Sequence, residues 1–235
     1  MNIRFYALLL FVFVLCTGCT AQRLTSKKPV MYASFEDFRF GPKGGADLVW
    51  ATKGITDEIT LRTALQKYDS MILDQTLIVV DKVTADTLDE KQILGISRQM
   101  FNEIKDRFGR WYKLVEVPTE NTLRMSIVLT SSESSKPFFA AAGGLFPVVP
   151  ENSSVAKIVV AEHIVPGNAM AELLVSDAES HKPIFATIDR HFGNEGVGAI
   201  IDSQGATKDA VSRWVERLWT TLYYWNWIKS RPPSA

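Results

Sequence analysis

Apolar and polar residues follow patterns along this chain that predict several β-strands. Between residues 123 and 130 the two kinds alternate with a period of two, which is typical of a strand with one buried face. The apolar members of this stretch are Leu123, Met125, Ile127 and Leu129. Strand is also predicted at 71–73 and 77–80, which flank Asp74, and at about 155–163, 169–176 and 183–190, with Pro166-Gly167-Asn168 separating the first two of these later strands.

An amphipathic helix is predicted at about 88–108, where apolar residues recur every three or four positions. Thr87 and Glu90 match a capping box, and Gly109 can take the left-handed conformation that ends many helices. The apolar face consists of Ile93, Ile96, Met100, Ile104 and Phe108.

A second amphipathic helix is expected near the end of the chain, with Thr207 as its N-cap. Its apolar face consists of Val211, Trp214, Val215, Leu218, Leu222 and Trp225. The order of these elements indicates an α+β fold. We expect an antiparallel β-sheet with two main amphipathic helices packed on one face.

The first 18 residues predict a bacterial lipoprotein signal peptide. Arg4 gives a positive start, the run from Phe5 to Leu15 is apolar, and Gly18 precedes Cys19. A helix of about eleven residues reaches roughly 16 Å, against roughly 30 Å for the hydrocarbon core of a bilayer, so the run is too short to span. We therefore expect signal cleavage between Gly18 and Cys19, and lipidation of Cys19.

The cysteine count agrees with this prediction. Both cysteines of the chain, Cys16 and Cys19, lie in the leader region, so the mature chain keeps one and acylation uses it. Acylation at Cys16 is the alternative, but it would place Leu15 directly before the cut, where the enzyme prefers a small residue.

These boundaries divide the chain into a leader at 1–18, a lipidated tether at 19–30, a single α+β periplasmic domain at 31–230 and a C-terminal tail at 231–235. The tether is polar, with little to bury. Position 20 is Thr rather than Asp, the residue that retains lipoproteins in the inner membrane in enterobacterial-type sorting. We expect the outer membrane, with the domain facing the periplasm.

Charge and hydropathy narrow the range of partners. The chain has 26 basic and 26 acidic residues and no basic stripe, which argues against nucleic acid. No apolar run of 18 residues follows the leader, so no second membrane span is expected. The expected partners are the membrane, through the N-terminal lipid, and an envelope protein.

Several motifs resemble a known family: Phe35-Glu36-Asp37-Phe38, then residues 44–50 (GGADLVW), 67–74 (KYDSMILD), 123–130 (LRMSIVLT), 171–177 (AELLVSD) and the Trp-rich final helix. The chain looks like the bacterial lipoproteins catalogued as domain of unknown function 3313, over roughly residues 33–225. It departs at Asp74-Gln75-Thr76, where members tend to show Asp-Pro-Val, and at Ser180-His181, where they show Thr-Gly. The resemblance implies location and architecture, and no established activity or catalytic residue.

No common catalytic motif occurs, since the chain lacks H-E-x-x-H, G-x-S-x-G and a Walker P-loop. We therefore predict no catalytic residues, no metal and no cofactor. The alternative is a periplasmic hydrolase-like or metal-dependent enzyme. It would use Glu172 with Asp189, if the strand register brings them onto one face, together with His163 or His191.

The segment from Pro137 to Pro150 has no charged side chain. Its large apolar residues are Phe138, Phe139, Leu145 and Phe146. One interpretation is a loop folded over the core, and the other is an exposed contact surface for a membrane or a partner.

The expected function is that of a non-catalytic, lipid-anchored protein that binds a partner or helps to maintain the cell envelope. A third possibility is the binding of a small apolar ligand between the sheet and the final helix. That function would require a cavity lined by Trp214, Leu218 and Trp225.

Overall fold

The computed structural model describes residues 32–56, 58–132, 136–141, 157–160, 166–190, 192, 196–202 and 204–224. The predicted leader, the tether and the C-terminal tail lie outside these residues. No helix in the described part of the chain is both long enough and apolar enough to cross a membrane.

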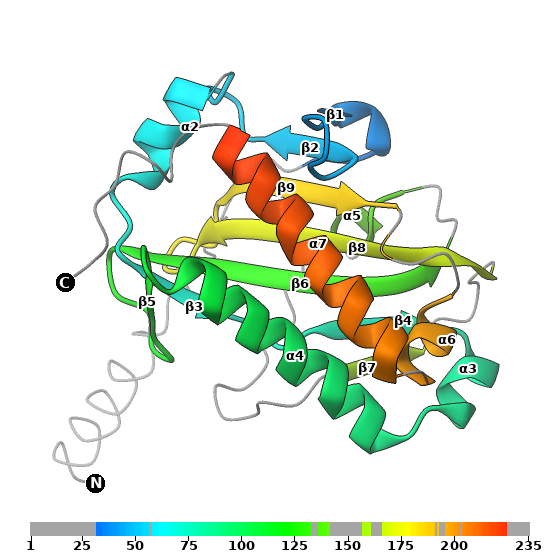
Figure 1. Ribbon diagram of the computed structural model, residues 1–235. Coiled ribbons are helices and arrows are strands. Elements are labelled where there is room, and N and C mark those ends of the chain that lie inside the picture. Colours follow the sequence, from blue (N-terminus) through cyan, green and yellow to red (C-terminus); the bar gives the residue numbers. More distant parts are fainter. Residues whose placement is uncertain are drawn as a thin grey trace, which may run out of the picture.

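A nine-stranded sheet forms the centre of the structure (Figure 1). Its strands run in the order β1 (Arg39–Phe40), β2 (Leu48–Ala51), β9 (Pro183–Asp189), β8 (Pro166–Asp177), β6 (Thr122–Ser132), β3 (Ser70–Leu73) and β5 (Lys113–Leu114). Strand β4 (Leu77–Val80) also pairs with β6, along a later stretch of that strand than β3 does. Strand β7 (Lys157–Val160) pairs with β4. Pro166-Gly167-Asn168, expected to separate two strands, instead begins β8.

The sheet is mixed, so the expectation of a purely antiparallel sheet is wrong for half of it. Strands β1, β2, β9, β8 and β6 pair antiparallel. Strands β3 and β4 pair parallel with β6, β5 with β3, and β7 with β4. The reason is the long connection from β4 to β6, which passes through two helices and returns the chain in the same direction.

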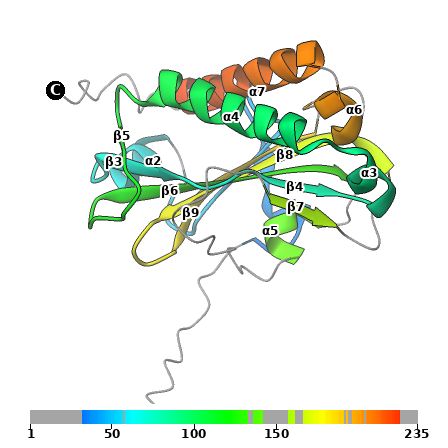
Figure 2. The ribbon, with the colours of Figure 1, turned by 90° about the horizontal axis from the view of Figure 1, so that it is seen from below.

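Two long helices, α4 (Glu90–Phe108) and α7 (Gln204–Tyr224), lie side by side on one face of the sheet, which confirms the α+β class (Figures 1 and 2). We call this the inner face. The shorter helices are η1 (Phe35–Asp37), α2 (Glu58–Leu65), α3 (Lys82–Thr87), α5 (Phe138–Ala141) and α6 (Val197–Asp202). Helix α5 lies on the other side, which we call the outer face (Figure 2).

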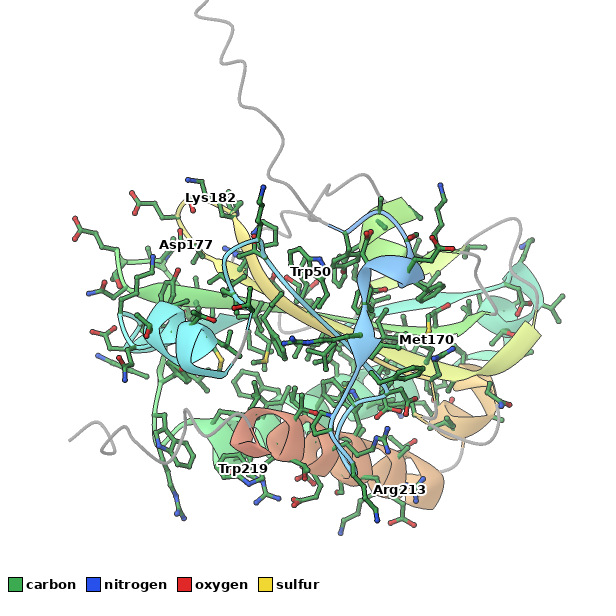
Figure 3. All side chains as sticks on the ribbon, turned by 90° about the horizontal axis from the view of Figure 1, so that it is seen from above. Trp50, Met170, Asp177, Lys182, Arg213 and Trp219 are labelled. Atoms are coloured by element: carbon green, nitrogen blue, oxygen red, sulfur yellow. The ribbon has the colours of Figure 1, made fainter. Side chains whose placement is uncertain are left out.

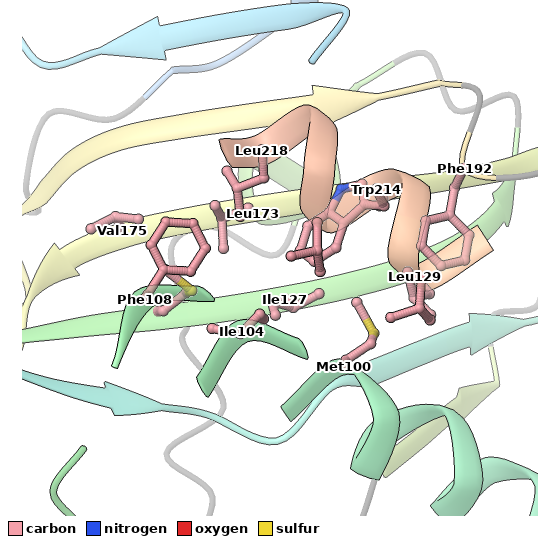
Figure 4. Packing of buried hydrophobic residues seen from close by; sticks show 14 of the residues in the cluster. Met100, Ile104, Phe108, Ile127, Leu129, Leu173, Val175, Phe192, Trp214 and Leu218 are labelled. Carbon is pink, nitrogen blue, oxygen red and sulfur yellow. The ribbon is translucent and has the colours of Figure 1, made fainter. Parts of the chain in front are cut away.

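The predicted apolar stripes meet in the inner core (Figure 4). Met100, Ile104 and Phe108 of α4, with Trp214 and Leu218 of α7, pack on Ile127, Leu129, Leu173 and Val175 of the sheet. Each of these side chains is buried. The helix periodicity and the alternation along β6 therefore identified the inner core correctly.

The outer face is covered as well, so β6 is not the half-buried strand that its alternation suggested. A second apolar cluster comprises Tyr32, Trp50, Leu77, Val79, Val128, Phe139, Leu174 and Ala186. Trp50 lies on this side of the sheet and Trp219 of α7 on the other (Figure 3). The segment from Tyr32 to Phe38 and helix α5 supply the covering side chains.

The ends of the two main helices differ from the predictions. Helix α4 is capped by Asp89 and Gln92 rather than by Thr87 and Glu90, because α3 already includes Thr87. Gly109 is right-handed, with φ −62°. Helix α7 begins at Gln204, and the Thr207 hydroxyl donates to the Ile200 carbonyl of α6 instead of capping the helix.

Candidate functional site

Glu172 lies in the middle of β8 and faces the outer side of the sheet. Its neighbours in register are Val128 of β6 and Ile188 of β9. Alternation along β8 places Glu172 on the same face as Met170 and Leu174, which belong to the outer apolar clusters. Its exposed fraction is 0%, so a carboxyl group is enclosed among apolar side chains.

Three donors converge on the Glu172 carboxyl group. The Tyr32 hydroxyl donates to Oε1 at 2.6 Å, the Phe138 amide to Oε2 at 2.6 Å and the Phe139 amide to Oε1 at 3.3 Å. Tyr32 comes from the start of the described chain, whereas the two amides belong to the first turn of α5. One side chain thus fastens both covering segments to the sheet.

Burial raises the pKa of Glu172 to about 7, although the three hydrogen bonds act in the opposite direction. The pKa of the Tyr32 hydroxyl is raised well above its ordinary value, first by burial and then by the charge of Glu172. A carboxyl group that titrates near neutrality inside a sheet is suited to acid–base chemistry. Here, however, its oxygens are occupied by the donors that hold Tyr32 and α5.

Asp189, the predicted partner of Glu172, lies on the opposite face. In the register of β8 and β9 it stands across from Ala171, so its carboxylate points to the inner side. There the Arg217 guanidinium of α7 donates to Asp189 through Nε and to Asp47 at 2.6 Å through Nη2. The sheet therefore separates the two carboxylates that a hydrolytic pair would need together.

The alternative enzyme would draw on two histidines for its metal site. His163 and His191 lie outside them, and no group of three or more potential metal ligands occurs among the residues that the structure describes. His181 occupies the turn between β8 and β9, with φ 54°.

A second polar cluster, which the sequence analysis missed, lies on the outer face. Arg124 Nη1 and the Ser126 hydroxyl each donate to Asp74 at 2.6 Å. Burial raises the pKa of Asp74, and these two donors oppose that shift. The alternation over residues 123–130 predicted that Arg124 and Ser126 face solvent. It did not indicate that β3 pairs with β6, which is the pairing that brings Asp74 beside them.

The uncharged segment at 137–150 is described only in its first part. Phe139 is buried, with 2% of its surface exposed, and Phe138 is half-buried against the outer cluster. Phe139 thus packs into the outer cluster in the described structure. Leu145 and Phe146 lie outside the described residues, as do Gly18 and Cys19.

An apolar cavity of about 20 Å³ lies between the sheet and the helices, next to Phe108, Tyr112 and Leu222. One water molecule requires roughly 10–15 Å³, so this space is too small for an organic ligand. Trp214 and Leu218 do not line it and are instead packed in the inner core. Trp225 lies outside the described residues.

Comparison with known proteins identifies the family to which the chain is similar. A family model described as "Protein of unknown function (DUF3313)" matches residues 43–218, well over half of the chain. The match includes Glu172, Asp189 and both long helices up to Leu218. No curated protein and no solved structure matches.

Proposed function

The chain belongs to the DUF3313 family, whose description names no activity, and we propose that it is a lipid-anchored cell-envelope protein that acts by binding a partner. The lipid is attached at Cys19 after cleavage of residues 1–18. The domain faces the periplasm from the outer membrane.

One observation carries the non-catalytic part of this proposal. The two carboxylates best suited to acid–base work point to opposite faces of the sheet, and each holds structural elements together. Glu172 fastens the covers of the outer face, while Asp189 fastens α7 to the sheet. Neither is presented to a substrate in the described structure, which favours a scaffold that presents surfaces.

The anchoring part is supported by the sequence and by where the described domain begins. Tyr32 is fixed to Glu172 by a hydrogen bond of 2.6 Å, roughly 13 residues after Cys19. A short polar connection between Cys19 and a tyrosine that is bonded to the sheet suits a tethered domain.

Fractionation of cell membranes, combined with in-cell crosslinking, tests this function. Wild-type protein is expected in the outer-membrane fraction, with a defined crosslinked partner. The Cys19→Ser variant is expected to leave that fraction and to lose the crosslink at equal abundance. A wild-type protein that crosslinks to nothing, and whose deletion abolishes a periplasmic hydrolytic activity, would favour the enzyme instead.

A further inference from the structure

The described chain starts on the outer face of the sheet. Tyr32 donates to Glu172 there, and its ring packs edge-on against Phe38 at 4.7 Å between centroids. Phe35 and Phe38 both pack against the apolar cluster of Leu48, Met170 and Ile188. Any anchor attached before Tyr32 is therefore joined to the domain on its outer face, opposite α4 and α7.

Phe40 lies at the edge of this same face. It stands across from Leu48 in the antiparallel pair of β1 and β2, and directly opposed residues point to the same side of a sheet. Leu48 is buried, whereas 86% of the Phe40 surface is exposed. Among the described large hydrophobic residues that are exposed, Phe40 has the highest exposed fraction.

The surroundings of Phe40 are polar, with nearly balanced charge. Arg39, Lys43 and Lys53 are exposed on β1 and on the two loops that flank β2. Arg39 Nη1 donates to the Thr56 carbonyl at 3.1 Å, which holds the second loop beside β1. The exposed carboxylates of η1 are those of Glu36 and Asp37. Contact through this corner would therefore depend on the aromatic ring more than on net charge.

The tether is short enough to favour contact with the anchoring membrane. About 13 residues separate Cys19 from Tyr32, and even a fully extended chain of that length cannot exceed about 45 Å. Such a connection holds the domain at an effective concentration in the millimolar range. A contact that is too weak to bring an unanchored protein to the membrane can therefore still form in the anchored protein.

We propose that the β1 corner, residues 39–43 with Phe40 at its centre, contacts the lipid headgroup surface of the membrane that holds Cys19. The outer face then lies toward the bilayer, and α4 and α7 face away from it. This inference rests on the proposed lipid anchoring and adds an orientation and a contact residue.

The cysteine content of the chain permits a direct test. The mature lipidated protein has no free thiol, because Cys16 leaves with the leader and Cys19 carries the lipid. A single thiol can therefore be placed at Phe40→Cys and labelled with an apolar, environment-sensitive aromatic fluorophore, which takes the place of the phenylalanine ring. Phe101→Cys is the matched control, since Phe101 is an exposed phenylalanine on α4, across the sheet.

Full-length lipidated protein is reconstituted in vesicles of phosphatidylethanolamine and phosphatidylglycerol, and the label is quenched from either side. At position 40 we expect strong quenching by lipid-borne nitroxide and protection from aqueous iodide. At position 101 we expect the reverse. Added salt should change these values little, because the charges near Phe40 almost balance.

A second variant pair tests the ring itself. A label at Lys43→Cys should report lipid contact when Phe40 is present and lose it with Phe40→Ser. Burial of one phenylalanine favours the docked state by about tenfold to a hundredfold, so the ratio of docked to undocked protein should fall by at least about tenfold. An unchanged ratio would overturn the assignment of Phe40.

The possible failures are distinguishable. Uptake of thiol label by wild-type protein would show a free Cys19 and overturn the anchoring together with this inference. Equal quenching at positions 40 and 101, with wild type unlabelled, would overturn the orientation and leave the anchor intact. Iodide protection at position 40 that persists in an unlipidated Cys19→Ser form, without vesicles or detergent, would mean that protein, such as a second copy of the chain, covers this position, and would also overturn it.

Discussion

Glu172 joins three parts of the chain that are far apart in sequence. Its carboxyl group accepts from the hydroxyl of residue 32 and from the amides of residues 138 and 139, all on the outer face of the sheet. Each donor would be left buried without its acceptor if the carboxyl group were lost. The attachment of both covering segments to the outer face therefore depends on this residue.

Glu172→Gln should destabilise the protein although its size is unchanged. Both oxygens of a carboxyl group can accept a hydrogen bond, even when one of them is protonated. The NH₂ group of an amide cannot, and in either orientation it would face the N–H of Phe138 or Phe139. A buried donor left unsatisfied costs about 1–3 kcal/mol. Chemical denaturation near pH 4.5, before Glu172 titrates in the folded protein, should show this loss for Glu172→Gln and almost none for Glu179→Gln, the same change at an exposed position. Equal stability of the two variants would contradict the role given to Glu172.

The raised pKa of Glu172 also predicts how stability varies with pH. The folded protein retains a proton up to about pH 7 that the unfolded chain releases near its ordinary value of 4.5. Rising pH between these values therefore favours the unfolded chain, by about 3 kcal/mol in total. Glu172→Gln lacks this titration, so the advantage of wild type in unfolding free energy should shrink over this range and vanish or reverse near pH 7 in urea titrations. A difference that widens with pH would show that hydrogen bonding outweighs burial at Glu172.

At the scale of elements, the final helix α7 is held by apolar packing on one side and by ions on the other. Trp214 and Leu218 enter the inner core, while Arg217 reaches Asp47 and Asp189. The Thr221 hydroxyl accepts from the Ala46 amide at 2.8 Å, which fastens the loop before β2 to the same helix. Packing and polar contacts thus fix the rotation of α7 on the sheet.

Trp214→Ala should remove much of this packing. Trp214 is 2% exposed, and truncation of a buried tryptophan typically costs about 3–5 kcal/mol. Thermal unfolding should show a sharply lowered Tm for this variant. Trp219→Ala, on the same helix but only partly buried beside Trp111, should lower it less. A larger effect at Trp219 would mean that the helix is rotated relative to the sheet.

The elements were predicted from the sequence where local periodicity decides them. Helix α4 and the inner side of β6 follow directly from the spacing of Ile104 and Leu129 with their neighbours. The parallel pairing of β3 and β4 with β6 was not predictable, because it depends on contacts across some fifty residues. The predicted N-cap of α4 was wrong for a local reason. Asp89, two residues after Thr87, is an equally good N-cap residue and takes that position.

The sequence predicted which residues were candidates for the site, but not how they are arranged. Glu172 stood out as a carboxylate in an apolar strand, but its face depended on a register that sequence does not specify. Its actual partners, Tyr32 and the amides of α5, come from segments with no recognisable motif. The available signal was a single carboxylate within an apolar strand. If such a group is buried, other parts of the chain must supply its hydrogen-bond donors.

At the scale of the whole molecule, the two faces of the sheet have different roles. The inner face carries the long helices and most of the core. The outer face carries the short covers, the start of the described chain and the exposed Phe40. With the proposed lipid anchor on the outer face, α4 and α7 would face away from the membrane, and we expect a protein partner to bind to that helical layer.

Lipid attachment at Cys19 is the central claim, because the location, the orientation and the tether all depend on it. Metabolic labelling with palmitate tests it most directly, in cells that produce wild type, Cys16→Ser or Cys19→Ser at equal abundance. The account predicts label in wild type and in Cys16→Ser, and none in Cys19→Ser. Label that survives Cys19→Ser but disappears in Cys16→Ser, or an unlabelled wild type, would contradict it.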